Sequence, residues 1–346
     1  MKKEKVLKGI GVFIISIIVL ILLIVMGFNI YQHIKFSKFY RASEKAMLIP
    51  DINSGITPQG FEYNKEDDTY YMCGYMKDGS ASRFYSFNDD TKAFKMAQMK
   101  TADGKLDASH SGGMAVWNDF VYLSTGKNVN IYRYSLLKDA LEKGETIAPF
   151  DTLETPLGPA FCYVKNNYLY VGEFYIAEKY ETPKNHHIKT DAGDNHKAIM
   201  TVYKLSKKSP NGIATEIPVA VYSIIDQAQG ICITDDGNIC ISTSWSLQPS
   251  HISVFEDPAH GIYRSIDDEK LEADSTYEVQ VEDKLYNVPL YYLDSNHLKK
   301  DWVVPPMTEG IVYKNGRIYI LYESASNKYL FGKLSGGTYI YSLPQE

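Results

Sequence analysis

Cysteine is scarce in this chain, which has four cysteines among 346 residues. So few cysteines in a chain of this length do not form a disulfide framework. The sequence has no Gly-x-Ser-x-Gly nucleophile motif, no P-loop and no dinucleotide-binding fingerprint. The net charge is -6 and no basic stripe crosses the sequence, so we expect no nucleic-acid partner.

Charge is absent from one long stretch near the N-terminus. Residues 9–27 are uncharged and largely aliphatic, and they follow four lysines. About 20 apolar residues span a bilayer as a helix, whereas a cleaved signal peptide has an apolar region of about 7–15 residues before a small-residue cleavage site. The sequence after residue 25 offers no such site. We therefore predict an uncleaved transmembrane anchor over residues 9–29.

The anchor divides the chain into segments. We predict a cytoplasmic N-terminus (1–8), the anchor (9–29), a basic stalk (30–45) and an ectodomain (46–346). Lysine and arginine are balanced on the two flanks, so the positive-inside rule does not decide the orientation. An anchor at the N-terminus favours a single-pass cell-membrane protein with its N-terminus in the cytoplasm and its ectodomain outside. This arrangement is typical of a bacterial cell-surface protein.

The ectodomain contains one hairpin pattern five times. Each copy has a polar or glycine start, an apolar strand, a tight turn and a second apolar strand. The copies begin at Gln59, Gly112, Gly158, Gln229 and Glu309. A further aromatic or β-branched strand follows each hairpin, and some copies add a fourth, clearest in residues 218–222 and 289–292. This repetition predicts an all-β protein, a five-bladed β-propeller after one transmembrane helix.

Two features of the propeller remain open in the sequence. A six-bladed alternative would need a degenerate blade within residues 276–293. The last repeat ends without a fourth strand, and we expect residues 47–56 to supply it and so close the ring. Two polar insertions, residues 176–197 and 258–287, interrupt the third and fourth repeats. We expect the first to form a solvated lid over the channel face and the second to lie on the opposite face.

The repeat register also predicts where a binding site should lie. In a propeller, the innermost strands begin and the second strands end on the same face, around the channel. The polar and aromatic side chains at these positions are candidate ligand-binding residues. They are Gln59, His110, Glu173, Gln229, Trp245, Glu309, Tyr322 and Glu323. Glu309 and Glu323 frame one hairpin, and two adjacent carboxyl groups raise one pKa, which makes this pair the candidate for catalysis.

Metal binding has little support in the sequence. The first insertion contains histidines and aspartates, but it lacks a recognised zinc spacing. The second insertion is acidic, and it lacks EF-hand-like spacing, so a divalent metal is possible without a motif to support it. Cys232 and Cys240 should face each other across a hairpin as a reduced pair, because direct cross-strand disulfides are strained. We predict no cofactor.

The Gln-Gly and Glu-Gly starts at Gln59, Gln229 and Glu309 resemble those of bacterial propellers of the quinoprotein-like and glutamine-cyclotransferase-like kind. This resemblance at the level of the repeat implies cyclisation of an N-terminal glutamine, with Glu309 as the candidate acid/base. The sequence as a whole leaves two functions open. One is a membrane-anchored extracellular module that binds a small molecule, peptide, glycan or protein partner at its channel face. The alternative is a cyclotransferase-like or lyase/hydrolase-like enzyme that uses Glu309 and Glu323. A closed pocket with shifted carboxyl pKa values would favour the enzyme, and a broad face with Tyr175 and Trp245 exposed would favour the binding module.

Overall fold

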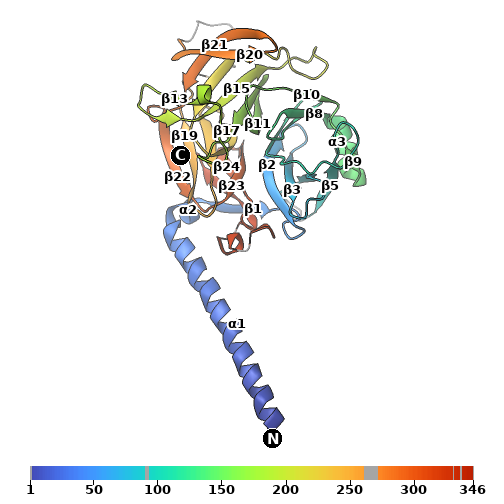
Figure 1. Cartoon of the computed structure of the whole chain (residues 1–346), viewed down its shortest axis with the longest axis vertical. Helices are drawn as coiled ribbons and strands as arrows, with labels where there is room; N and C mark the ends of the chain where they lie inside the picture. The colour runs from blue at the N-terminus through green and yellow to red at the C-terminus, as the bar shows by residue number, and fades with distance from the viewer. Residues whose placement is uncertain (1, 90–92, 261–271, 330, 336, 346) are drawn as a thin grey trace.

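The computed structural model shows one long helix that projects from a β-propeller (Figure 1). It describes residues 2–89, 93–260, 272–329, 331–335 and 337–345. Helix α1 (Lys2–Lys35) contains the apolar stretch, and the part from Gly9 to Lys35 is long and apolar enough to cross a membrane. None of its most apolar window is buried against the propeller. The short helix α2 (Ser37–Ala42) then joins α1 to the propeller.

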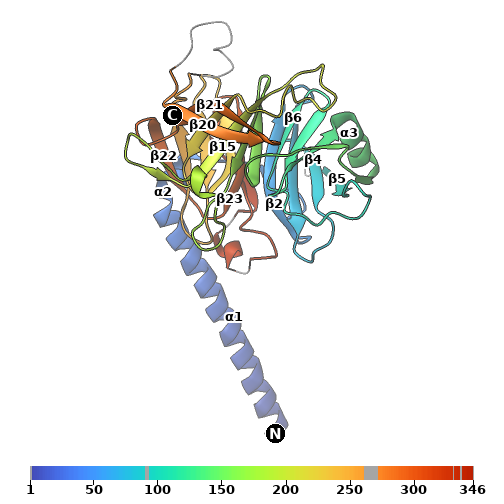
Figure 2. The ribbon, with the colours of Figure 1, turned by 45° about the horizontal axis from the view of Figure 1, so that its top comes forward.

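Five sheets form the blades, as the sequence predicts (Figure 2). Blade one has β2 (Ile56–Asn64), β3 (Thr69–Met76), β4 (Arg83–Phe87) and β5 (Phe94–Met99), and blade two has β6 (Gly113–Trp117), β7 (Phe120–Ser124), β8 (Val129–Arg133) and β10 (Asp151–Leu153). Blade three has β11 (Pro159–Lys165), β12 (Tyr168–Glu173), β15 (Ala198–Lys204) and β16 (Ala220–Ile224), and blade four has β17 (Ala228–Ile233), β18 (Ile239–Thr243), β19 (Ser250–Phe255) and β22 (Leu298–Val304). Blade five has β23 (Thr308–Lys314), β24 (Arg317–Tyr322), β25 (Tyr339–Pro344) and β1 (Glu44–Leu48). The innermost strands β2, β6, β11, β17 and β23 contact one another in a closed ring.

The N-terminal strand β1 closes the ring by pairing antiparallel with β25, from Glu44 opposite Ser342 to Leu48 opposite Tyr339. We expected residues 47–56 to form this strand. An N-terminal strand does close the ring, but it consists of residues 44–48, so the expected boundaries are wrong. The reason is the distance that the chain must cross from the outer edge of blade five to the inner strand β2. Residues 49–55 make this crossing through a turn in which Asp51 and Gly55 have positive φ.

Segments of two blades cover the outer edges of the blades before them. In blade two, α3 (Tyr134–Lys143) leads to β9 (Thr146–Ile147), which pairs in parallel with β5 of blade one. In blade four, β20 (Ser275–Val281) and β21 (Lys284–Tyr292) form a hairpin, and β21 pairs in parallel with β16 of blade three. Strand edges covered in this way cannot pair with another chain.

The hairpin of β20 and β21 corrects three expectations. The strand at residues 289–292 belongs to the sheet of blade three, and β22 is the fourth strand of blade four. The six-bladed alternative is wrong, because its extra blade is this edge hairpin. The described part of the second insertion also contacts the first insertion, since Asn185 Nδ2 donates to Tyr277 Oη at 2.9 Å. Pairing with β16 therefore brings the two insertions together, and residues 261–271 lie outside the described residues.

The first insertion is folded onto blade three. It contains the 3-10 helix η1 (Lys184–His186) and the two-stranded pair β13 (Ile188–Lys189) and β14 (Asn195–His196). Most of the insertion is exposed, as expected of a solvated segment, but His186 and His196 are only 2% and 5% exposed and hold it against the blade. His196 Nδ1 lies 2.9 Å from Ser223 Oγ of β16, a contact that fixes the insertion on its blade.

Cys232 and Cys240 face each other across the β17–β18 pair, and both are buried free cysteines, as predicted.

Candidate functional site at the channel mouth

A glycine near the start of the innermost strands allows the five strands to close into a narrow ring. A Cβ atom on Gly310 would lie 2.6 Å from the backbone nitrogen of Phe61, and one on Gly60 would lie 2.8 Å from that of Met114. Only glycine permits this approach between neighbouring backbones. The repeated Gln-Gly and Glu-Gly starts therefore have a packing reason that applies whatever the protein binds.

Bulges at the same positions place the preceding side chains at the channel mouth. The register of β2 with β3 shifts between Pro58 and Phe61, and that of β23 with β24 shifts between Thr308 and Ile311. Gln59 and Glu309 lie within these shifts. A bulge bends the strand and re-aims a side chain. The two polar residues consequently leave the pleat of their strands and meet Glu323, which follows the end of β24.

Glu309 and Glu323 form a coupled pair of carboxyl groups. Glu309 is 2% exposed and Glu323 is half-buried. Burial and the neighbouring Glu323 charge raise the pKa of Glu309 well above its usual range. Burial also raises the pKa of Glu323 to about 7, against hydrogen bonds that favour its ionised form. Glu309 is therefore the protonated member at neutral pH and donates a hydrogen bond to Glu323.

Neutral hydrogen-bonding groups surround the pair. Gln59 Nε2 donates to Glu323 Oε2 at 3.1 Å, and Tyr329 Oη donates to the same oxygen at 2.9 Å. The Gln59 carbonyl oxygen contacts His110 Nε2. Desolvation around the ring and the Lys328 ammonium lower the pKa of His110 to about 4, so this histidine is neutral at pH 7 although its outer edge is exposed. The negative charge of the mouth at neutral pH therefore lies on Glu323, which is about half ionised at pH 7.

One ammonium group of the chain itself occupies the rim of this mouth. Lys328 Nζ lies 4.4 Å from the ring centroid of Tyr75 and 5.2 Å from that of Tyr329. The Tyr75 ring also lies 4.6 Å from the ring of His110. Lys328 is exposed, and its charge favours the ionised form of both carboxyl groups. Aromatic faces beside a carboxylate are a favourable place for a cation.

The structure places the other four candidate residues differently. The buried Glu173 lies 2.8 Å from His186 Nδ1 and accepts the backbone N–H of Ile199, so it fastens the first insertion. Tyr322 is fully buried in the hydrophobic core with its ring 6.1 Å from Tyr341. Gln229 is half-buried at the start of β17. These three residues do not contact the pair through any hydrogen bond among the described residues.

Trp245 belongs to a separate aromatic cluster between blades three and four. Its ring lies 6.1 Å from the rings of both Phe174 and Tyr180, and Lys179 Nζ lies 4.6 Å above it. Trp245 is half-buried, and Tyr175 is only 5% exposed. The exposed Tyr175 and Trp245 that the binding-module hypothesis expects are therefore not found, since Tyr175 is buried and Trp245 is half-buried.

Sequence reasoning missed a buried acid inside the channel. Glu62 of β2 is 8% exposed, and its Oε1 accepts the backbone N–H of Tyr63 at 2.9 Å. Burial raises the pKa of Glu62 to about 8. The signal was present in the sequence, since Glu62 stands between two aromatic residues in an innermost strand. The Glu62 carboxyl group is therefore mostly neutral below pH 8. It interacts with Tyr163, and both burial and the Glu62 charge raise the pKa of that tyrosine.

Two cavities lie away from the carboxyl pair. One cavity of about 510 Å³ lies between the two insertions, beside His186 and Tyr277, and another of about 460 Å³ lies beside α2. Neither includes Glu309 or Glu323. Within the described part of the chain, no three histidine, cysteine, aspartate or glutamate residues are grouped as metal ligands.

Comparison with solved structures finds propellers whose sequences have low identity to this chain. No protein-family model matches the chain, and no curated protein matches it. A PQQ-bound aldose sugar dehydrogenase from Streptomyces coelicolor is 11% identical over 87% of this chain and 97% of its own, with a TM-score of 0.44. The WD40 domain of Toxoplasma gondii coronin is 10% identical over 81% and 69%, with a TM-score of 0.37, and a nidogen/laminin complex is 7% identical over 78% and 73%, with a TM-score of 0.38. The expected resemblance to quinoprotein-like propellers is thus confirmed, and at these scores it carries no argument about activity.

Proposed function

We propose that this chain is a single-pass membrane protein whose extracellular propeller binds a small ligand with a primary amine, such as a peptide N-terminus or an amino sugar, at its channel mouth. The observation that carries the proposal is the position of Lys328. The chain's own ammonium lies on Tyr75 and Tyr329, beside the carboxyl pair. A ligand ammonium would displace this exposed side chain and take its place.

The surrounding groups support such a ligand. Glu323 supplies the negative charge, and the buried Glu309 acts as a donor while it stays protonated. Gln59 and His110 offer further hydrogen bonds for polar groups of the ligand. Lys328 Nζ donates to Tyr75 Oη, whereas a ligand ammonium would bond directly to Glu323. The ligand would therefore favour the ionised forms more strongly than Lys328 does and lower both carboxyl pKa values. Binding should release protons and tighten as the pH rises through about 7.

Titration calorimetry on the full chain in detergent tests this proposal. The ligands are a set of short peptides with a free N-terminus, including N-terminal glutamine, and the same peptides acetylated. We expect only the free amines to bind, with an apparent enthalpy that depends on the buffer because protons are released. Glu323→Gln should weaken binding at least tenfold, and Glu66→Gln, an exposed carboxylate outside the mouth, should not. Equal binding of acetylated peptides, or full binding by the Glu323 variant, would show that the ligand is not an amine held by this pair.

The raised pKa values favour a second candidate, an enzyme of the cyclotransferase-like kind. A carboxyl group with a pKa of about 7 serves either as acid or as base near neutral pH. The same peptides with N-terminal glutamine distinguish the two functions. An enzyme would release ammonia and leave a cyclised peptide that mass spectrometry detects, with loss of turnover in Glu309→Gln. Binding without any product supports the binding module.

The orientation of the anchor is tested separately. A cysteine introduced at the exposed Lys207 of the propeller should react with a membrane-impermeant maleimide on intact cells. Protection until the cells are lysed would place the propeller in the cytoplasm.

A further inference from the structure

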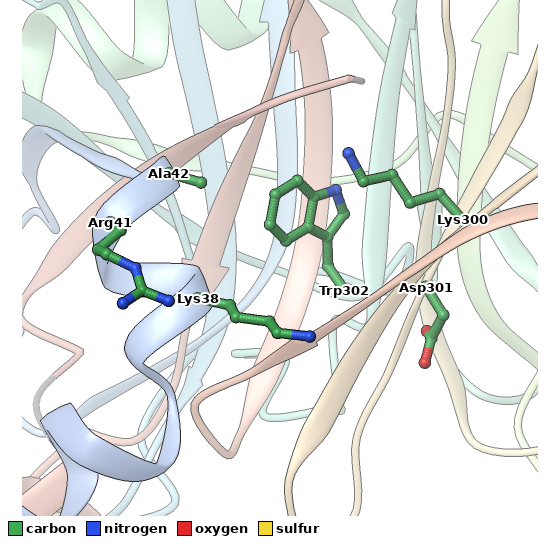
Figure 3. A pocket seen from close by; sticks show the side chains of 6 residues that line it. All are labelled: Lys38, Arg41, Ala42, Lys300, Asp301 and Trp302. Atoms are coloured by element: carbon green, nitrogen blue, oxygen red, sulfur yellow. The ribbon is translucent and has the colours of Figure 1, made fainter.

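A basic cavity lies where the anchor meets the propeller. It has a volume of about 460 Å³ and lies between α2 and β22 (Figure 3). Lys38 and Arg41 come from α2, and Lys300, Asp301 and Trp302 come from β22. Figure 3 shows Lys38 and Arg41 on one side of the Trp302 ring and Lys300 on the other.

The single acidic residue of this cavity is already engaged. Asp301 Oδ2 lies 2.7 Å from His251 Nδ1, and its Oδ1 accepts the hydroxyl of Ser253 at 2.9 Å. Lys38, Arg41 and Lys300 have no carboxylate partner among the described residues. Lys300 Nζ lies 4.1 Å from the centroid of the Trp302 ring. The cavity therefore presents three positive charges beside one aromatic ring.

Trp302 adds an unused hydrogen-bond donor. Its Nε1 atom is buried and has no partner among the described residues. A buried indole N–H normally finds an acceptor. Figure 3 shows this nitrogen on the side of the ring next to Lys300, so an anion that draws the Lys300 ammonium away from the ring would reach the indole N–H and contact the basic side chains at the same time.

The place of the cavity along the chain identifies the source of that anion. The apolar part of α1 gives way to polar residues after Phe28, and Lys35 follows about 10 Å further along the helix at 1.5 Å per residue. The headgroup layer of a bilayer is about 5–8 Å thick on each side. The exposed Tyr31 lies in this interval, as aromatic residues at membrane interfaces do. At the same rise Lys38 lies about 15 Å beyond Phe28, so Lys38 and Arg41 lie just outside the headgroup layer, and their long side chains reach back toward it.

We propose that this cavity binds the phosphate headgroup of an anionic phospholipid and thereby fixes the propeller against the membrane surface. The proposal rests on the membrane anchoring put forward above and does not depend on the ligand at the channel mouth. Basic residues near an anionic leaflet each strengthen binding roughly fivefold. The three residues of the cavity should therefore give a clear preference for anionic lipid.

The test uses the full chain in nanodiscs that contain equal amounts of phosphatidylcholine and phosphatidylglycerol. The protein is extracted in mild detergent, and native mass spectrometry counts the lipids that it retains. The test variant combines Lys38→Gln, Arg41→Gln and Lys300→Gln. The matched control combines Lys143→Gln, Lys207→Gln and Lys208→Gln, three exposed lysines outside the cavity.

We expect the wild type and the control to retain phosphatidylglycerol preferentially. In the test variant the ratio of retained phosphatidylglycerol to phosphatidylcholine should fall at least tenfold, while the unfolding temperature in detergent stays unchanged. Equal retention of both lipids by the wild type, or an unchanged preference in the test variant, would overturn the proposal while leaving the anchor intact. A chain that fails to enter nanodiscs would overturn the anchor as well. Loss of phosphatidylglycerol on adding millimolar inorganic phosphate would show that a free anion, and not a lipid, is the natural occupant.

Discussion

Replacing Glu62 by glutamine should remove a specific part of the pH dependence of stability. The carboxyl group of Glu62 is buried in the channel with a pKa of about 8, whereas its usual value is 4.5. Because the folded state holds its proton more tightly, the group destabilises the fold as the pH rises from 4.5 to 8. A shift of this size corresponds to about 5 kcal/mol at 1.36 kcal/mol per pH unit, as an upper bound if water enters the channel.

Urea unfolding of the full chain in detergent at pH 5, 7 and 9 measures this effect. The wild type and Glu62→Gln should have similar free energies of unfolding at pH 5, because the protonated acid and the amide are both neutral. At pH 9 the variant should be the more stable protein by several kcal/mol. Subtracting the two curves removes the titration of all other groups. The difference in unfolding free energy between the variant and the wild type should therefore grow between pH 5 and pH 9. Growth of less than about 1 kcal/mol would refute the reasoning, because Glu62 would then ionise in the folded protein about as readily as in the unfolded chain.

Three further predictions concern the ring, the site and the closing strand. Gly310→Ala should lower the free energy of unfolding in urea by about 1–3 kcal/mol, because the new Cβ would lie 2.6 Å from a backbone nitrogen. The control Gly158→Ala should lower this free energy by less, because its Cβ would lie 3.3 Å from the nearest atom, a backbone oxygen. Tyr329→Phe should raise the pKa of Glu323 above about 7 in an infrared titration of the carboxyl band, because it removes a bond to the ionised form, and an unchanged value would contradict the contact. Removing residues 1–48 should expose the edge of β25 and cause concentration-dependent association in sedimentation, while a chain starting at Ser43 should stay monomeric.

The local sequence was sufficient to predict the inner two strands of every blade. Each hairpin is a short alternation of apolar residues around a tight turn, and both strands pair with a near neighbour in sequence. The outer strands are less local. Residues 289–292 have the composition of a fourth strand, and they pair in parallel with Val221–Ser223 of the preceding blade. The choice of partner depends on which sheet edge is open in the folded molecule, and no local pattern records it.

The candidate site was predicted in part for a similar reason. Gln59, His110 and Glu309 stand at inner-strand starts and Glu323 follows a second strand, and these positions come together because they lie on one face of the propeller. Tyr322 does not join them, because successive residues of a strand point to opposite faces and Glu323 follows it directly. Lys328 and Tyr329 lie in the long connection between the second and third strands of blade five, and they have no equivalent in the short connections of blades one, two and four, so the register could not select them.

That loop also connects the channel mouth to helix α1. It leaves β24 at Glu323, passes Lys328 and Tyr329, and continues through the 3-10 helix η2 (Gly332–Ser335), which contacts α1. Gln32, near the end of α1, is 5% exposed. One loop thus carries residues that contact the carboxyl pair and, further along, residues that contact α1, so the arrangement of the candidate site and the position of α1 on the propeller depend on the same segment.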